Sequence, residues 1–157
     1  MTSFLTALTT DDLRAAGVPE PWSFGHQDRV RFYELDALGH VNNTAYLRWF
    51  ETLRVEWFGS RNLSFYGPDD PTFVLKSVMC TYHAPMFLHD TYIVAARAES
   101  FRNSSFTKTY AVFSNGKLTA EGRAVVVMTD KAGTTKVPLS DEMRQTLIAM
   151  DGAEDAR

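Results

Sequence analysis

The chain has few of the features that would place it outside a cell or in a membrane. It contains one cysteine, Cys80, so no internal disulfide can form and an oxidising compartment is not indicated. Its apolar runs are short, and Ala124–Met128 is far too short to span a bilayer. The first residues, MTSFLTALTTDDL, have no basic segment ahead of an apolar stretch, unlike a signal peptide. We therefore expect a cytoplasmic protein with no membrane partner.

The chain also lacks the charge and the motifs of several functional classes. Its net charge of -3 argues against nucleic acid as a partner, because nucleic-acid binding usually requires a basic face. It has no Walker loop, no strand-linked G-x-G-x-x-G and no G-x-S-x-G elbow. His26, His83 and His89 are scattered without the spacing of metal ligands. We therefore expect no metal and no cofactor.

The length and composition are those of one globular domain. The chain has 157 residues, of which 45% are hydrophobic and 22% are charged. Residues 1–23 form a lead-in, in which TTDDLRAAGV predicts a short helix capped by Thr9 or Thr10. Residues 24–150 form the domain, and residues 151–157 form an acidic tail that we expect to be frayed.

A long helix is predicted over residues 43–58. Apolar residues recur there with helical spacing, at Tyr46, Phe50, Leu53 and Trp57. Three more apolar residues widen this seam, namely Leu47, Val55 and Phe58. More than half of the helix circumference is therefore expected to be buried. Asn42 or Asn43 suits the N-cap, and Gly59 suits the left-handed residue that follows the last turn.

The other elements are mostly strands. One strand is predicted over residues 24–35, before the helix, and four follow it, over residues 73–83, 90–101, 105–113 and 117–128. Asn115-Gly116 joins the last two as a tight hairpin turn, and a final helix covers residues 140–150. A lone apolar helix must be covered, and an antiparallel sheet is the only available partner. The order therefore predicts an α+β fold, with a curved antiparallel sheet wrapped around one long helix.

Polar residues gather where the long helix begins, at Asp36, Gly39, His40, Asn42 and Asn43. The first N–H groups of a helix lack internal acceptors and can stabilise an oxygen that becomes negative. A carboxylate beside such a site, here Asp36, is the minimal equipment for transferring an acyl group to water. The alternative for Asp36 is an Asx-turn, in which its carboxylate only accepts backbone hydrogen bonds.

Two further candidates also have ordinary explanations. His40 could be a general base, although a lone loop histidine is more often simply solvated. Glu51 lies two turns into the helix, where Arg48 and Arg54 at i-3 and i+3 suggest surface ion pairs instead.

The segment RFYELDALGHVNNTAYLRWFETLRVEWF, residues 31–58, resembles the signature of hot-dog fold acyl-CoA thioesterases, particularly the 4-hydroxybenzoyl-CoA thioesterase-like group. The resemblance implies a homodimer or homotetramer with active sites between subunits. It also implies that Asp36 is the catalytic carboxylate and that the backbone amide of Asn43 polarises the thioester carbonyl. Four residues of this stretch are expected to contact substrate: Gly39, Val41, Asn42 and Tyr46.

Two related patterns add further candidates. The plant acyl-carrier-protein thioesterases carry a similar HVNN stretch that Asp36 and His40 match, although Leu38 replaces an acting asparagine. A second hot-dog branch uses a helix carboxylate at a position that Glu51 could match. We expect hydrolysis of acyl-CoA to the free acid and CoA. The alternatives are an acyl-acyl-carrier-protein thioesterase, a thioester hydratase or dehydratase, and a non-catalytic acyl-thioester-binding dimer.

Overall fold

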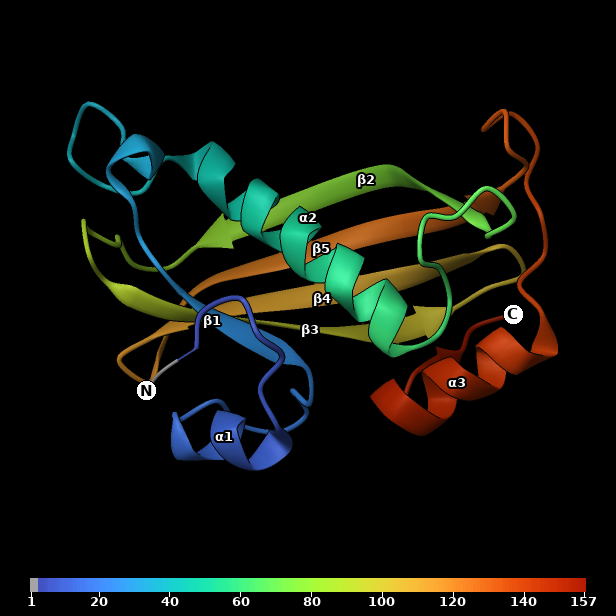
Figure 1. The fold of residues 1–157 in the computed structure, drawn as a ribbon, viewed down its shortest axis with the longest axis horizontal. Helices are drawn as coiled ribbons and strands as arrows, with labels where there is room; N and C mark the ends of the chain where they lie inside the picture. Colours follow the sequence, from blue (N-terminus) through green and yellow to red (C-terminus); the bar gives the residue numbers. More distant parts are fainter. Residues whose placement is uncertain (1–2) are drawn as a thin grey trace. The chain divides into compact units, whose positions relative to one another are not determined.

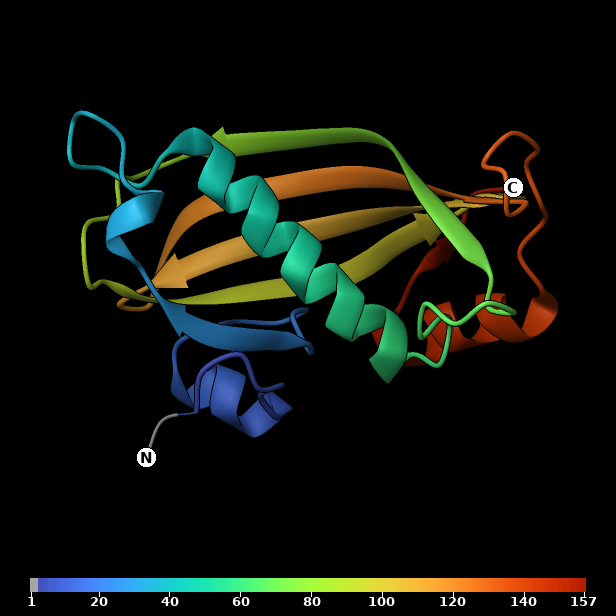
Figure 2. The ribbon, with the colours of Figure 1, turned by 45° about the horizontal axis from the view of Figure 1, so that its top comes forward.

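The computed structural model describes residues 3–157, which form three α-helices, a 3-10 helix and one sheet (Figure 1). The helices are α1 (Thr10–Ala15), η1 (Phe32–Glu34), α2 (Asn43–Ser60) and α3 (Asp141–Asp151). The strands are β1 (Gly25–Arg29), β2 (Thr72–Tyr82), β3 (Thr91–Phe101), β4 (Ser105–Ser114), β5 (Lys117–Thr129) and β6 (Glu154–Asp155). The order in the sheet is β1-β3-β4-β5-β2, and β6 pairs with β3 (Figure 2). The prediction of an α+β fold with a curved antiparallel sheet and a long helix packed on it is confirmed.

The described chain divides into two compact units, which we call unit 1 and unit 2. Unit 1 contains residues up to 54 together with 80–96 and 110–122, and unit 2 contains 55–79, 97–109 and 123–157.

In unit 1, successive side chains of β3 point to opposite faces of the sheet. Tyr92 lies on one face and stacks on Trp49 of α2, with ring centroids 4.0 Å apart. Ile93 lies on the other face and packs with Leu13 of α1. The first half of α2 and the helix α1 therefore cover opposite faces of the strands in this unit.

A close approach of helix and sheet in unit 1 depends on a glycine. A Cβ added at Gly122 of β5 would lie 2.4 Å from the ring of Phe50. Phe50 is fully buried and stacks on Tyr110 of β4, with centroids 4.5 Å apart. The missing side chain at position 122 therefore makes room for the Phe50 ring.

Unit 2 has an aromatic core with a buried ion pair beside it. Phe58 of α2 stacks on Phe73 of β2, with centroids 4.8 Å apart, and both rings contact Phe106 of β4. Asp151, at the end of α3, accepts hydrogen bonds from Trp57 Nε1 at 2.9 Å and from Arg61 Nε at 3.0 Å. These bonds attach α3 to the end of α2.

The predicted strand over residues 24–35 is wrong in its second half, because β1 ends at Arg29 and η1 follows. Arg31 makes two hydrogen bonds to Asp28, of 2.7 and 2.9 Å, which bend the chain back on itself. Glu34 accepts a hydrogen bond from the Arg31 N–H at 2.8 Å and so closes the 3-10 turn. The strand-like pattern of residues 24–35 did not reveal this local capping.

Two predictions for the long helix also need correction. Gly59 lies inside α2, and Asn62 takes the left-handed conformation instead, with φ 54°. The Asn62 N–H donates to Gly59 O and the Leu63 N–H to Phe58 O, so the chain turns after Arg61. The buried seam is also narrower than predicted, because Val55 is 46% exposed.

The remaining local predictions are largely confirmed. Thr9 caps α1 and Ser140 caps α3, and Asn115-Gly116 forms the hairpin turn with both φ angles positive. Asn42 Oδ1 accepts a hydrogen bond from the Thr44 N–H at 2.9 Å, as expected of a cap for α2. The acidic tail is not frayed at β6, because its residues pair with Ser100 and Phe101 of β3.

Candidate active site

The turn between η1 and α2 is held by its own backbone. The Asp36 N–H donates to His40 O at 2.8 Å, and the Gly39 N–H donates to Asp36 O at 3.1 Å. Gly39 has φ +77°, a conformation that other residues adopt only with strain, so the glycine closes the turn. The Val41 N–H then donates to Met86 O at 2.9 Å, which ties the turn to the segment after β2.

Asp36 forms the predicted Asx-turn, and its catalytic role stays a prediction. Its Oδ1 atom accepts hydrogen bonds from the N–H groups of Leu38 at 2.8 Å and His40 at 3.3 Å, as in an Asx-turn. Its Oδ2 atom accepts no hydrogen bond from any residue in the described range 3–157. The turn therefore orients the carboxylate and leaves one oxygen open to a water or a substrate.

The first turn of α2 presents a free backbone donor beside this carboxylate. The Asn43 N–H has no acceptor among residues 3–157. The carbonyl of Asn43 is held, because it accepts a hydrogen bond from the Tyr82 hydroxyl at 2.9 Å. The end of β2 thereby positions the helix terminus where an N–H group can meet an anionic oxygen.

Asp36 and Asn43 share a cavity of about 320 Å³ in unit 1. Its other lining residues are His40, Val41, Tyr46, Tyr82, His83, Ala84 and Pro85. The structure thus brings together five of the residues predicted for the site: Asp36, His40, Val41, Asn43 and Tyr46.

Three predicted residues lie elsewhere. Gly39 shapes the turn without lining the cavity, and Asn42 lines a second cavity. Glu51 is exposed and lines neither, and within residues 3–157 it forms no ion pair. Arg54 donates to the Tyr110 hydroxyl at 3.0 Å instead of pairing with Glu51.

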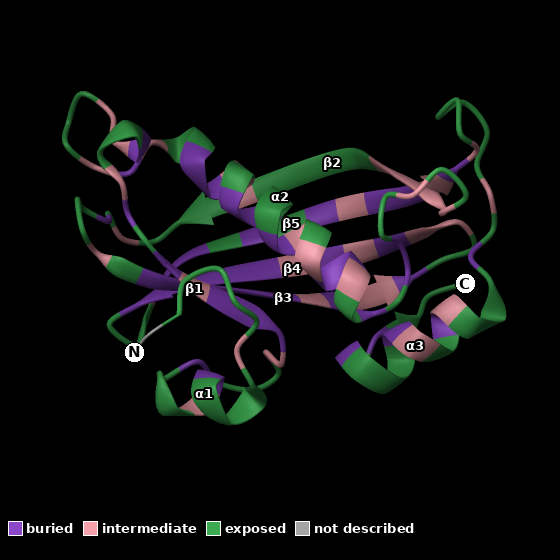
Figure 3. Ribbon diagram, viewed as in Figure 1, coloured by how far each residue is buried: buried purple, intermediate pink, exposed green. Residues whose placement is uncertain are grey.

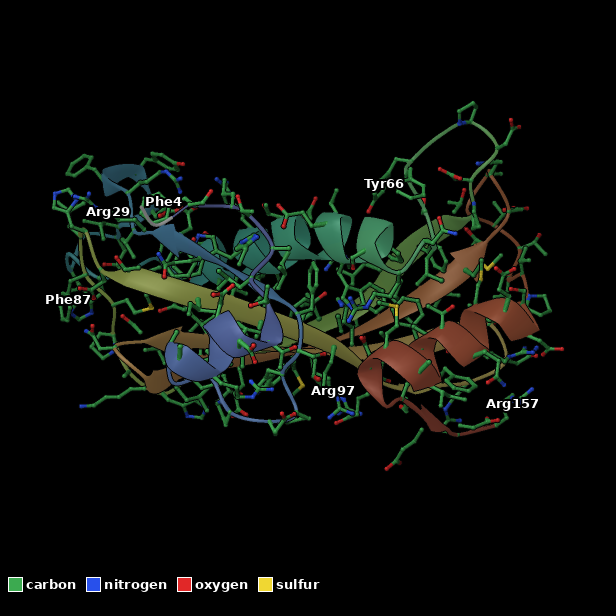
Figure 4. The ribbon with its side chains drawn as sticks, turned by 60° about the horizontal axis from the view of Figure 1, so that its bottom comes forward. Phe4, Arg29, Tyr66, Phe87, Arg97 and Arg157 are labelled. Atoms are coloured by element: carbon green, nitrogen blue, oxygen red, sulfur yellow. The ribbon has the colours of Figure 1, made fainter. Side chains whose placement is uncertain are left out.

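His40 is half-buried at the cavity wall. Its ring meets the ring of Phe87 edge-on, with centroids 5.2 Å apart. Figure 4 shows Phe87 in the loop after β2, at the same end of unit 1 as Phe4 and Arg29. The imidazole is therefore oriented by an aromatic neighbour.

The lining residues that come from the end of β2 and the turn after it were not predicted for the site. Tyr82, His83, Ala84 and Pro85 come from the end of β2 and the turn that follows. His83 Nε2 lies 2.8 Å from Glu121 Oε2 of β5, so the imidazole is held in place. The only sequence signal was a polar pair, Tyr82-His83, just before a proline turn, and nothing local places it opposite Asp36.

The phenols of this cavity are protonated at neutral pH, as an unperturbed tyrosine is, and burial makes them weaker acids still. Burial raises the pKa of Tyr46 to about 12, with smaller contributions from Cys80 and Tyr82. It also raises the pKa of Tyr82 to about 12, and the hydrogen bond with Cys80 adds to this shift. Both hydroxyls are therefore hydrogen-bond donors under ordinary conditions.

The second cavity, of about 440 Å³, lies between η1 and the outer side of α2. Its acidic groups are already satisfied: Asp28 pairs with Arg31, and Glu34 accepts from Trp49 Nε1 at 2.9 Å. These bonds hold η1 on the helix, so we assign this cavity a structural role. Among the described residues, no cluster of three His, Cys, Asp or Glu side chains could hold a metal ion. No described helix is long and apolar enough to cross a membrane.

The sequence model of the thioesterase-like superfamily matches residues 30–147, which include the turn, the helix and the strands that build this cavity. The chain belongs to the thioesterase-like superfamily. The resemblance of residues 31–58 to hot-dog thioesterases is thereby confirmed.

Solved structures and a curated relative agree with this membership. A thioesterase superfamily protein from Jannaschia sp. CCS1 is 42% identical and superposes with a TM-score of 0.92, covering 98% of each chain. A thioesterase from Thermus thermophilus, solved with coenzyme A and Zn, is 30% identical with a TM-score of 0.74, covering 85% of this chain and 98% of its own. The long-chain acyl-CoA thioesterase FadM of Escherichia coli K12 is 26% identical over 129 residues, 79% of this chain and 96% of its own.

Proposed function

We propose that this thioesterase-superfamily protein hydrolyses acyl-CoA to a carboxylic acid and CoA, with Asp36 and the Asn43 N–H as its catalytic groups. The observation that carries the proposal is their common cavity: Asp36, which has one carboxylate oxygen without a partner in residues 3–157, and Asn43, whose N–H has no acceptor there, line the same space. One can accept a proton while the other stabilises an oxyanion. The coenzyme A bound to the Thermus thermophilus thioesterase supports CoA as the carrier.

In the proposed reaction, the carbonyl oxygen of the thioester accepts a hydrogen bond from the Asn43 N–H. Asp36 takes a proton from a water molecule as the water oxygen bonds to the carbonyl carbon. The tetrahedral intermediate carries its negative charge on the oxygen facing Asn43. When the carbonyl re-forms, the carbon–sulfur bond breaks, and the departing CoA thiolate takes the proton held by Asp36, which leaves the free acid, the CoA thiol and the Asp36 carboxylate.

His40 and Glu51 have lesser parts in this proposal. His40 lines the cavity, and the Phe87 ring orients it, so it can contact the substrate or exchange the proton held by Asp36. Glu51 is exposed and lines neither cavity, so the proposed reaction does not use it.

Replacing Asp36 with asparagine is the decisive test. The amide oxygen can still accept the hydrogen bonds of Leu38 and His40, so the turn is expected to survive. We expect kcat/KM for a panel of aromatic and aliphatic acyl-CoAs, followed with a thiol reagent, to fall at least about a hundredfold.

Asp130→Asn is the matched control. Asp130 also accepts backbone hydrogen bonds through one carboxylate oxygen, from the N–H groups of Thr134 and Thr135. It lies in unit 2, outside the cavity, so its variant should retain wild-type turnover. An Asp36→Asn protein that folds and keeps its activity within about threefold would rule out the carboxylate mechanism. A wild-type protein that cleaves no acyl-CoA would rule out the carrier.

A further inference from the structure

The lining of the catalytic cavity includes Tyr46, whose hydroxyl has no hydrogen-bond partner in residues 3–157. Tyr46 is 3% exposed, and its ring packs on those of Trp49 and Tyr82, with centroids 4.9 and 5.1 Å apart. Its hydroxyl forms no hydrogen bond with any residue from 3 to 157. The hydroxyl oxygen is not fully buried, so a ligand in the cavity can reach it. Buried polar groups normally have partners, so an open phenol in a cavity wall needs an explanation.

The burial of the lining residues orients a thioester in this cavity. Asn43 is exposed and Asp36 is half-buried, so the reacting carbonyl lies near the mouth. A large, charged carrier such as CoA must extend from there into solvent. The acyl group then points inward, toward the buried Tyr46.

The charge of the cavity limits what that acyl group can be. Its lining offers apolar contacts from Val41, Ala84 and Pro85 and from the rings of Tyr46 and Tyr82, so hydrocarbon is accommodated. A carboxylate is disfavoured, because among residues 3–157 no Lys or Arg lines this cavity and Asp36 does. A neutral oxygen, in a keto or hydroxyl group, suits a phenol donor, and the raised pKa of Tyr46, about 12, keeps that donor protonated.

We propose that the Tyr46 hydroxyl donates a hydrogen bond to a neutral oxygen on the acyl group, and so selects oxygen-bearing acyl thioesters over plain aliphatic ones. This inference rests on the proposed function for the orientation of the thioester. It makes Tyr46 a specificity-determining residue, separate from the groups that attack or polarise the carbonyl. A site with an open buried donor discriminates against ligands that leave it unpaired.

Binding of unreactive CoA thioethers tests the selectivity without requiring turnover. The probes are S-butyl-CoA, S-(3-oxobutyl)-CoA and S-(4-hydroxybutyl)-CoA, whose dissociation constants are measured by titration calorimetry. We expect the wild type to bind at least one oxygenated probe about tenfold more tightly than S-butyl-CoA, as one hydrogen bond allows. In Tyr46→Phe, which keeps the ring and its packing, this preference should fall below about twofold.

Tyr33→Phe is the matched control, because Tyr33 is exposed and lies outside this cavity. It should keep the wild-type preference. Equal binding of all three probes by the wild type, no binding of any probe, or an unchanged preference in Tyr46→Phe would each overturn the inference.

Hydrolysis of 3-oxobutanoyl-CoA and butanoyl-CoA separates this inference from the proposed function. If Asp36-dependent hydrolysis occurs with no preference for the oxygenated probes, only the inference fails. If the preference depends on Tyr46 but neither ester is hydrolysed, the hydrolytic function fails and the ligand selectivity stands. A Tyr46→Phe variant that loses turnover of both esters equally would place the hydroxyl on the thioester carbonyl, and would overturn the selectivity.

Discussion

At the scale of single residues, one carboxylate holds an unusual number of partners in unit 2. The side chain of Asp151 is fully buried and accepts hydrogen bonds from Trp57, from Arg61 and from the Ala98 N–H at 2.6 Å. These donors come from α2, the turn after it and β3. A buried charge of this kind is tolerated because its partners satisfy it, and removing it leaves Arg61 uncompensated in the interior.

Replacement of Asp151 with alanine should therefore lower the free energy of unfolding by about 3–5 kcal/mol, measured by urea denaturation. Asp141→Ala provides the comparison on the same helix. The Asp141 side chain is 93% exposed and pairs only with Arg144, so its loss should cost about 1 kcal/mol or less. Equal losses in the two variants would contradict the view that α3 is attached through Asp151.

At the scale of elements, Gly59 lies inside α2, because the helix continues to Ser60. A Cβ at Gly59 would meet only the ring of Phe65, at 3.6 Å, which is an ordinary contact. The φ of this glycine is not in the left-handed range, since the left-handed residue is Asn62. Glycine is a poor helix former, so position 59 is a weak point of the helix, unlike Gly122, where space requires glycine.

Two alanine substitutions should thus have opposite signs. Gly59→Ala should raise the free energy of unfolding by about 0.5–1 kcal/mol, through helix propensity. Gly122→Ala should lower it by about 1–3 kcal/mol, because the new methyl group collides with the buried Phe50 ring. Thermal or urea denaturation measures both. Destabilisation by Gly59→Ala would indicate that α2 ends earlier, with glycine as its left-handed cap.

At the scale of the whole molecule, the edge strand β2 is open along most of its length (Figure 3). Four of its large hydrophobic side chains are exposed: Leu75, Val78, Met79 and Tyr82. Monomeric proteins usually protect an edge strand with charge, proline or a cover, and β2 carries only Lys76 among charged residues. We therefore propose that β2 is the contact surface of a homodimer.

A charge placed on this edge should separate the proposed dimer. The wild-type protein should sediment at about twice its chain mass of 17.7 kDa, and Met79→Lys should shift it toward one chain mass. Met150→Lys introduces the same change at an exposed methionine of α3 and should leave the mass unaltered. Sedimentation of the wild type as a monomer would contradict the proposal.

Interactions between residues close in the sequence explain why much of the fold could be predicted. The seam of α2, its cap at Asn42, the hairpin at Asn115-Gly116 and the cap at Ser140 each depend on neighbours within a few positions. The same locality exposed Asp36, His40 and Asn43 as one candidate cluster, because a single turn carries all three. Where the apolar pattern was ambiguous, hydrogen bonds between residues close in the sequence decided the boundary of the element. The Asp28–Arg31 fork ended β1 early, and the turn at Asn62 displaced the predicted cap at Gly59.

The part of the site that β2 and the turn after it contribute could be placed only from the tertiary structure. Tyr82 and His83 are more than forty-five positions from Asp36 in the sequence, and only the packing of β2 beside α2 in unit 1 brings them to one cavity. Tyr46 was visible as one apolar position of the helix, yet its role as an open donor follows from what surrounds its hydroxyl. Periodicity records which side of an element is buried. It does not record which distant side chains will meet there, because that depends on how the strands are ordered and paired.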